Sequence, residues 1–188
     1  MRDDSGRVVE ERYLDANGDP VARYGDYYGL SYEYDKTSTV ITYLDGEGNP
    51  IILSDGYSII VRTQVGGRAS DDFYYDLNGQ QVQCSGGYYG AHREFNTEGQ
   101  NTSLTFLDKD GHAVSTSSGY AIKTYQRDRN GTIVGEQYFD TEGNPVRPLL
   151  GQYGESYQRN EQGHIGQITY LDADGNPDPT NAGYTILK

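Results

Sequence analysis

Aromatic and apolar residues recur in a short motif that the chain carries six times. The motif reads aromatic, large apolar, Asp, two variable residues and Gly, as in Tyr13-Leu14-Asp15-Ala16-Asn17-Gly18. Its aspartates are separated by 30, 31, 32, 32 and 32 residues; they are Asp15, Asp45, Asp76, Asp108, Asp140 and Asp172. A period held this closely indicates a tandem repeat.

Each repeat also predicts an earlier tight turn, such as Asn96-Thr97-Glu98-Gly99, which begins 12 residues before Asp108. The Asx side chain accepts a hydrogen bond from the backbone two residues on, and Gly takes the positive φ of the turn. The flanking segments are rich in Tyr, Thr, Ile and Val, which favour strands, and no segment has a helical apolar period. The sequence therefore predicts an all-β fold of tandem β-hairpin repeats of about 32 residues, forming an elongated single-layer or solenoid-like array.

We expect one repeat domain over residues 1–188. Its units are about 1–25 (partial), 26–55, 56–86, 87–118, 119–150, 151–182 and 183–188 (partial). Since the chain starts inside a repeat and stops on the opening strand of another, we interpret it as part of a longer protein. The alternative is that the C-terminal strand pairs near the N-terminus and closes a ring.

The second strand of each unit has a distinct apolar and a distinct polar end. The position two before each Asp is always aromatic, and we predict that this column fills the layers of the core; it comprises Tyr13, Tyr43, Tyr74, Phe106, Tyr138 and Tyr170. Farther back the strand is polar, as at Asp71 and Asp72 or at Glu136 and Gln137. We therefore expect that end of the strand to be solvated.

Composition changes the picture in two respects. Hydrophobic residues are only 34% of the chain, whereas it has 25 Gly and 19 Tyr, so many thin tyrosine-closed layers are expected in place of one thick core. The net charge of -13 disfavours binding to nucleic acid or to an anionic membrane surface. Cys84 is the only cysteine, which excludes an internal disulfide, and no stretch has the apolar length of a transmembrane helix or the pattern of a signal peptide.

Candidate binding residues gather where a Gly-aromatic corner opens each new unit. Two tyrosine pairs are found at these corners, Tyr27-Tyr28 and Tyr88-Tyr89. The two rings of one pair cannot both point inward on an extended strand, so we expect one ring of each pair to be exposed. An exposed ring beside Gly suits the apolar face of a sugar, and nearby arginines suit a carboxylate or phosphate of a polymer, unless they pair with carboxylates of the chain itself. The predicted ligand-binding residues are Tyr27, Tyr28, Tyr57, Tyr88, Tyr89, Tyr120, Tyr153, Tyr184, Arg93, Arg127 and Arg159.

The tandem Tyr-Asp-x-x-Gly turns resemble the YD repeats of large bacterial surface and toxin proteins. The Gly-Tyr corner is similar to the cell-wall-binding and glucan-binding repeats of Gram-positive bacteria. Two features depart from the latter: the chain has no Trp, and its units are longer. The resemblance implies a β-hairpin solenoid of a bacterial cell-envelope or extracellular protein, appended to an enzyme that makes or trims envelope polymers.

Metal and catalytic interpretations are weaker. The stretch Asp172-Ala173-Asp174-Gly175 places Gly at the fourth position and lacks the bidentate Glu of a calcium loop, and turn chemistry accounts for its aspartates. The histidines, His92, His112 and His164, lie at unrelated positions of different units. We therefore predict no metal, no cofactor and no enzymatic activity.

Two functions remain open. The first is a non-catalytic module that binds a polysaccharide or another cell-wall polymer through the aromatic corners, where several weak sites gain avidity on a repetitive ligand. The alternative is a structural spacer or assembly domain that has no ligand of its own and contacts other domains of a longer parent protein.

Overall fold

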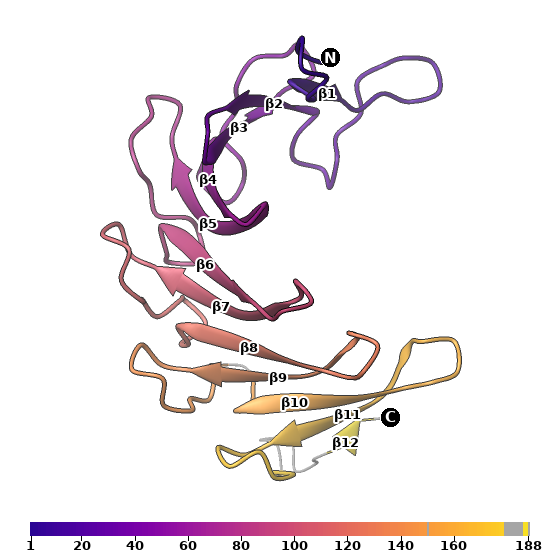
Figure 1. The fold of residues 1–188 in the computed structure, drawn as a ribbon, viewed down its shortest axis with the longest axis vertical. Helices are drawn as coiled ribbons and strands as arrows, with labels where there is room; N and C mark the ends of the chain where they lie inside the picture. The colour runs from indigo at the N-terminus through magenta and orange to yellow at the C-terminus, as the bar shows by residue number, and fades with distance from the viewer. Residues whose placement is uncertain (150, 179–185, 188) are drawn as a thin grey trace. The chain divides into compact units, whose positions relative to one another are not determined.

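The computed structural model describes residues 1–149, 151–178, 186 and 187, and Tyr184 lies outside the described residues. The described chain is all-β and contains no helix (Figure 1). Its strands are β1 (Glu10–Arg12), β2 (Gly29–Tyr34), β3 (Ser38–Leu44), β4 (Ile59–Val65), β5 (Arg68–Tyr75), β6 (Gly90–Phe95), β7 (Asn101–Leu107), β8 (Ile122–Arg127), β9 (Ile133–Phe139), β10 (Gly154–Arg159), β11 (Ile165–Leu171) and β12 (Ile186–Leu187).

The chain divides into two compact units, Met1–Ala91 and His92–Lys188, and β6 spans their boundary. In the first unit β1 to β5 pair antiparallel in sequence order. In the second unit β7 to β11 follow the same rule, and β12 pairs with β11. The predicted all-β class is confirmed in each unit.

Asx turns close the hairpins. Between β8 and β9, the Asp128 Oδ1 accepts the backbone N–H groups of Asn130 and Thr132, both at 2.9 Å, and Gly131 has a φ of 82°. The turn of the β4–β5 hairpin has no Asx residue and is formed by Gly66 and Gly67, which both have positive φ. Because the turn chemistry is local, it follows directly from the sequence.

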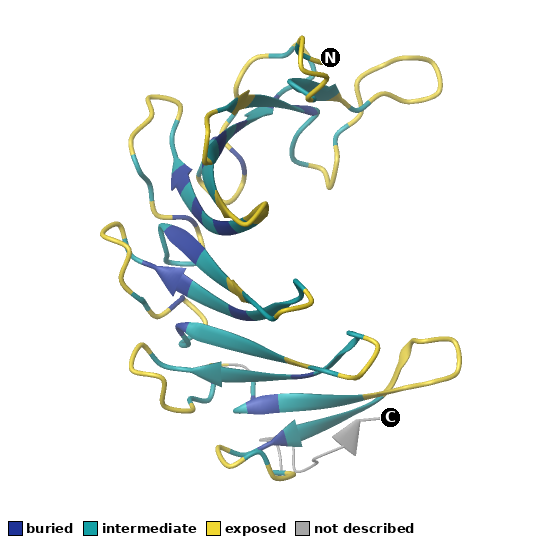
Figure 2. Cartoon of the chain, viewed as in Figure 1, coloured by how far each residue is buried: buried dark blue, intermediate teal, exposed yellow. Residues whose placement is uncertain are grey.

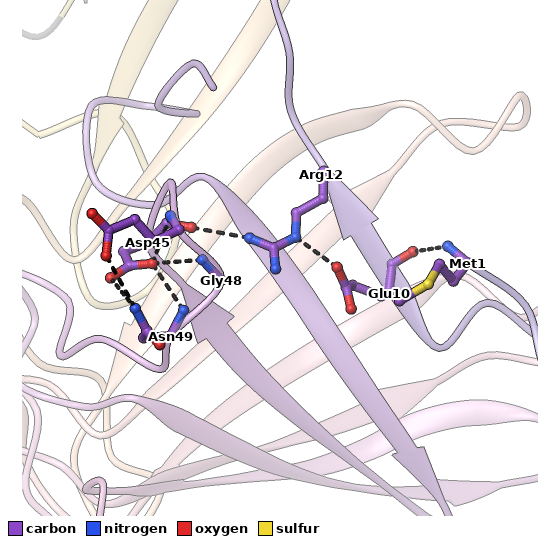
Figure 3. Close-up of polar contacts among 7 residues, drawn as sticks. Met1, Glu10, Arg12, Asp45, Gly48 and Asn49 are labelled. Carbon is purple, nitrogen blue, oxygen red and sulfur yellow. Dashed lines mark hydrogen bonds and ion pairs between the residues drawn. The ribbon is translucent and has the colours of Figure 1, made fainter. Parts of the chain in front are cut away.

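The repeated Asp motif forms a second turn at the opposite end of each hairpin. The Asp45 Oδ1 accepts the N–H groups of Glu47, Gly48 and Asn49 at 2.9, 2.7 and 2.8 Å (Figure 3). The same carboxylate-to-backbone bonds recur at Asp15, Asp76, Asp108, Asp140 and Asp172. The prediction that these aspartates form turns is therefore confirmed.

A third turn, which we call the corner turn, precedes each Gly-aromatic corner. In Leu53-Ser54-Asp55-Gly56 the Gly56 N–H donates to the Leu53 carbonyl at 2.9 Å. The next corner turns have the same bond and run from Cys84 to Gly87, from Thr116 to Gly119 and from Pro148 to Gly151. Their first residue is buried in all four cases, so an inward-facing side chain fixes each turn to the core.

The core of each unit is thin. In the first unit it consists of Ile41, Ile60, Tyr74 and Cys84, against which half-buried tyrosines pack. Figure 2 shows that buried residues are scattered along the strands, that most strand residues are half-buried and that exposed residues gather in the turns. This distribution is what a chain poor in aliphatic residues and rich in tyrosine can build.

One expectation about the strands is wrong. Asp72 was expected to lie in a solvated strand end, but it is only 2% exposed. Arg62 of β4 lies opposite Asp72 of β5 and pairs with it, so the neighbouring strand supplies the charge that permits burial. The sequence of β5 alone does not contain that information.

Candidate functional site

The aromatic residues of the first unit form a continuous series of ring contacts, which we call the tyrosine ladder. In this ladder, the aromatic residues that lie two positions before each motif Asp alternate with the corner tyrosines. Successive ring centroids lie 5.8, 4.9, 5.9, 4.6 and 5.9 Å apart along Tyr13, Tyr27, Tyr43, Tyr57, Tyr74 and Tyr88. Most of these contacts are edge-to-face, the geometry that aromatic pairs prefer.

The ladder gives three predicted binding residues a structural role. Tyr27, Tyr57 and Tyr88 are half-buried between column tyrosines. Burial, together with the neighbouring rings, raises the pKa of Tyr57 well above its ordinary value, so this phenol stays neutral. These rings therefore hold successive hairpins together through contacts worth about 0.5–1.5 kcal/mol each beyond the area they bury.

The second ring of each tyrosine pair is also partly covered. Tyr28 and Tyr89 are half-buried like Tyr27 and Tyr88, so the expectation of one exposed ring in each pair is wrong. The ring of Tyr28 lies against Gly46, where an added Cβ would be 3.6 Å from the Tyr28 Cδ1. The Asp turn that follows in the chain thus covers a ring that strand alternation alone would leave outside.

Two of the predicted arginines bind backbone carbonyls. Arg127 donates to the carbonyl of Gly131 at 2.7 Å and to that of Asn101 at 2.8 and 3.1 Å. Arg159 repeats the arrangement, donating to Gly163 at 2.9 Å and to Ile133 at 3.2 Å. Each arginine therefore links its own hairpin turn to the preceding hairpin. From the sequence, each was expected to bind a polymer or to pair with a carboxylate of the chain, and neither expectation includes this role.

The remaining predicted arginine, Arg93, is half-buried in β6. It lies two strand residues away from Ala91, at the boundary of the two units. Its position does not bring it into the lining of either cavity described below.

The backbone places Tyr153 differently from the other corner tyrosines. The Tyr138 N–H donates to the carbonyl of Tyr153, just as the Phe106 N–H donates to that of Ala121, the residue after Tyr120. Tyr153 is thus equivalent to Tyr28 and Tyr89, which accept from Tyr13 and Tyr74. The position that carries Tyr27, Tyr57, Tyr88 and Tyr120 elsewhere is occupied by Gln152.

A cavity of about 480 Å³ lies beside this position in the second unit. Its walls come from two successive corner turns and the strands that follow them; the lining residues are Ser117, Ser118, Tyr120, Tyr138, Pro148, Leu149, Gly151 and Glu155. The rings of Tyr120 and Tyr138 lie 4.8 Å apart at 56°. Of the predicted residues that the structure describes, Tyr120 alone lines this cavity, which we call the Tyr120 pocket.

The sequence contained a signal for the residues that were missed. Leu149 is 74% exposed, an unusual position for a leucine, and Gln152 is only 5% exposed, an unusual position for a glutamine. Both depart from the repeat pattern at one corner. Aligning the units by their corner turns, in place of their Tyr residues, would have revealed both departures.

Charges around the Tyr120 pocket are negative or paired. The Tyr138 hydroxyl donates to Glu136 Oε2 at 3.2 Å, and Lys123 forms an ion pair with the same carboxylate. The Lys123 ammonium also lies 5.7 Å from the centroid of the Tyr138 ring. Burial, followed by Glu136 and Glu155, raises the pKa of Tyr138, so its hydroxyl remains a donor at neutral pH. The arrangement offers hydroxyl groups and a carboxylate around two rings.

A second cavity of about 450 Å³ lies on the other face of the second unit. Its lining includes Thr124 of β8 together with Ser103 and Thr105 of β7, which point to the face opposite to that of Phe106. It contains no ring of the ladder and none of the predicted binding residues. We therefore take the Tyr120 pocket as the candidate site.

Within the described residues, no group of three or more His, Cys, Asp or Glu side chains is arranged to hold a metal ion. No helix there has the length and apolar character to cross a membrane. No family model matches the chain, and no curated protein matches it. The geometry of the Tyr120 pocket is therefore the main basis for a functional argument.

Proposed function

We propose that this chain is a non-catalytic repeat module that binds a neutral glycan in the Tyr120 pocket. The observation that carries the proposal is the convergence of two tyrosine rings with serine hydroxyls and a carboxylate in one cavity of about 480 Å³. That volume lies within the range of pockets that hold small ligands, which are lined by apolar and aromatic groups with a few polar ones.

The chemistry of the lining fits a sugar ring. A pyranose has one apolar face of C–H groups and an equator of hydroxyls, so it can pack on Tyr120 or Tyr138 while its hydroxyls donate to Glu155. Glu155 and the net charge of -13 disfavour acidic polymers, because like charges repel across a partly desolvated site. Neutral glycans are therefore favoured over the anionic polymers that the arginines first suggested.

The wider setting follows from the repeat pattern. We propose that the hairpins form an elongated, solenoid-like array and that the array belongs to a bacterial cell-envelope or extracellular protein, in keeping with the resemblance to YD and cell-wall-binding repeats. The recurrence of three turns in each repeat supports the array. Its partner would be a cell-wall polysaccharide, bound at the Tyr120 pocket with a Kd on the order of millimolar.

One observation favours the alternative of a structural spacer. In the first unit the corner tyrosines are rungs of the ladder, and a ring packed on both sides serves cohesion between repeats. A protein that needed only to separate other domains would use its tyrosines in this way throughout. The Tyr120 pocket is the feature that such a spacer does not require.

A pull-down with envelope polysaccharides, combined with a glycan array, tests the proposal. Leu149→Ser changes a pocket residue that is 74% exposed, and Val65→Ser is the matched control at a hairpin turn, where Val65 is 72% exposed. We expect a neutral glycan to bind the native chain and the control, and to bind Leu149→Ser more weakly. Absence of binding to any glycan would favour the spacer, and equal binding to all three proteins would show that the Tyr120 pocket is not the binding site.

A further inference from the structure

Two departures from the repeat pattern meet at one corner turn of the second unit. The first is Gln152, which takes the place of the ladder tyrosine. The second is Leu149, the second residue of its corner turn, where the three preceding corner turns carry Ser54, Ser85 and Ser117. Both changes run against ordinary burial preferences, since the amide is buried and the leucine is exposed.

The buried amide lacks a compensating contact. Gln152 is 5% exposed, and in the described part of the chain its Oε1 has no hydrogen-bond partner. A buried acceptor left in this state is costly, so a fold optimised only for stability would place tyrosine there, as in the four preceding corners. A ligand that donates a hydrogen bond to this amide would relieve the cost.

The effect of Gln152 on the ladder explains the cavity. In the first unit each inner column ring, such as Tyr43, has a corner ring on both sides. Tyr138 has Tyr120 on one side, but the next ladder position after Tyr138 is Gln152, which has no ring. The Tyr120 pocket opens beside this missing rung, between Tyr138, Gly151 and Leu149.

We propose that the missing rung makes the Tyr120 pocket a single specificity site for one N-acetylated amino-sugar unit of a glycan. This inference rests on the proposed function and narrows its ligand. The sugar ring replaces the absent tyrosine ring against Tyr138. Its acetamido methyl group packs on Leu149 and Pro148 of the lining. Gln152 follows the lining residue Gly151 in the chain, and on binding its side chain turns toward the pocket, so that its unpaired oxygen accepts the acetamido N–H.

This arrangement makes Leu149 and Gln152 the residues that determine specificity. A plain hexose keeps the ring contact but leaves the apolar patch uncovered and the amide oxygen without a donor. A site built to pair a buried polar group discriminates strongly against a ligand that lacks the matching group. It also follows that residues 1–149 and 151–178 contain one such site, because the four preceding corners keep their tyrosine.

Calorimetric titration of the whole chain with chitotetraose and cellotetraose tests the inference. The two oligosaccharides have the same linkage and differ in the acetamido group. We expect chitotetraose to bind at least about tenfold more tightly, with one site per chain. Gln152→Tyr should abolish this binding and raise the melting temperature, because the new ring covers Tyr138 and removes the buried amide.

Further variants identify the contact. Leu149→Ser should reduce the preference for chitotetraose, and Val65→Ser, at an exposed position away from the pocket, should retain it. Equal affinity for both oligosaccharides, several sites per chain, or unchanged binding by Gln152→Tyr would overturn the inference. If another neutral glycan binds and needs Leu149 while chitotetraose does not bind, the proposed function stands and the inference falls. If no glycan binds, both fall.

Discussion

The Arg62 guanidinium forms a bidentate ion pair with the Asp72 carboxylate across β4 and β5. The Nε–Oδ1 distance is 2.7 Å and the Nη2–Oδ2 distance is 2.9 Å. Asp72 is 2% exposed, so its charge is tolerated in the first unit because a planar donor fork satisfies both of its oxygens. The two residues lie directly opposite one another in the register of the two strands.

We predict that Arg62→Ala lowers the free energy of unfolding by about 2–3 kcal/mol, because it removes one partner of a largely buried charge pair. The lower end of the usual range applies because the Arg62 side chain is 33% exposed. Urea unfolding followed by circular dichroism measures the change. Arg7→Ala, which removes an exposed pair with Asp3, is the control and should cost clearly less than Arg62→Ala. Equal effects of the two variants would contradict the role of burial.

Two Gly→Ala substitutions at the same position of two Asp turns should differ in how much stability they cost. Gly18 and Gly48 occupy the same turn position, with φ values of 90° and 98°. Gly18→Ala should cost about 1–2 kcal/mol through backbone strain alone, since no atom lies near an added Cβ. Gly48→Ala should cost more, because its Cβ would displace the Arg12 guanidinium that donates to the Asp45 carbonyl at 3.2 Å (Figure 3).

Urea unfolding measures the loss of stability in each of the two glycine variants. Repeating both substitutions in a chain that also carries Arg12→Ala tests whether Arg12 causes the difference between them. In that background the two substitutions should become equal in cost. A difference that persists without Arg12 would show that another contact of the second turn is responsible.

Stability should fall in acid through the turn aspartates. Donation by backbone N–H groups lowers the pKa of Asp15, Asp45, Asp76 and Asp108. Because the folded-state pKa lies below the unfolded value of about 4, the stabilisation is present above that pH and is lost as the pH falls through the folded value. The urea midpoint should therefore be constant near neutral pH and decline below about pH 4.

The turn asparagines supply the control for the acid effect. Asn96 and Asn160 accept the same type of backbone bond without titrating. Replacing Asp76 with Asn should keep the turn and reduce the slope of stability against pH in acid. A slope that stays the same across such replacements would assign the acid transition to other carboxylates.

The tyrosine ladder should make the protein sensitive to alkali. Burial raises the pKa of Tyr43 and Tyr57 above the ordinary value near 10. Because the folded state favours the neutral phenol, its contribution is complete below about pH 10 and is lost as the pH rises through the folded-state pKa. Tyrosinate absorbance and circular dichroism, followed together, should change in one cooperative step above about pH 10. Full ionisation with an unchanged dichroism spectrum would contradict the burial of the ladder.

The candidate site was only partly predictable from the sequence. Tyr120 was found because strand alternation and the Gly-aromatic pattern are visible locally, and it does line the pocket. Leu149 and Gln152 were missed because the units were aligned by their tyrosines, and the hydrogen bond between Tyr138 and Tyr153 shows which backbone position each residue occupies. Arg127 was predicted to face a ligand, but it reaches a carbonyl 26 residues away.

The sequence by itself determined the repeat period, the strand and turn chemistry and the thinness of the core, because each of these depends on residues within a few positions of one another. Only the tertiary structure decided which side chains are buried against one another and where a cavity remains. It interleaved corner and column tyrosines into one ladder, buried Asp72 against Arg62, and left a cavity beside Tyr138 and Gly151. The physical reason is that burial and pairing are properties of neighbouring strands, and a strand's neighbours are set by the packing of the repeats.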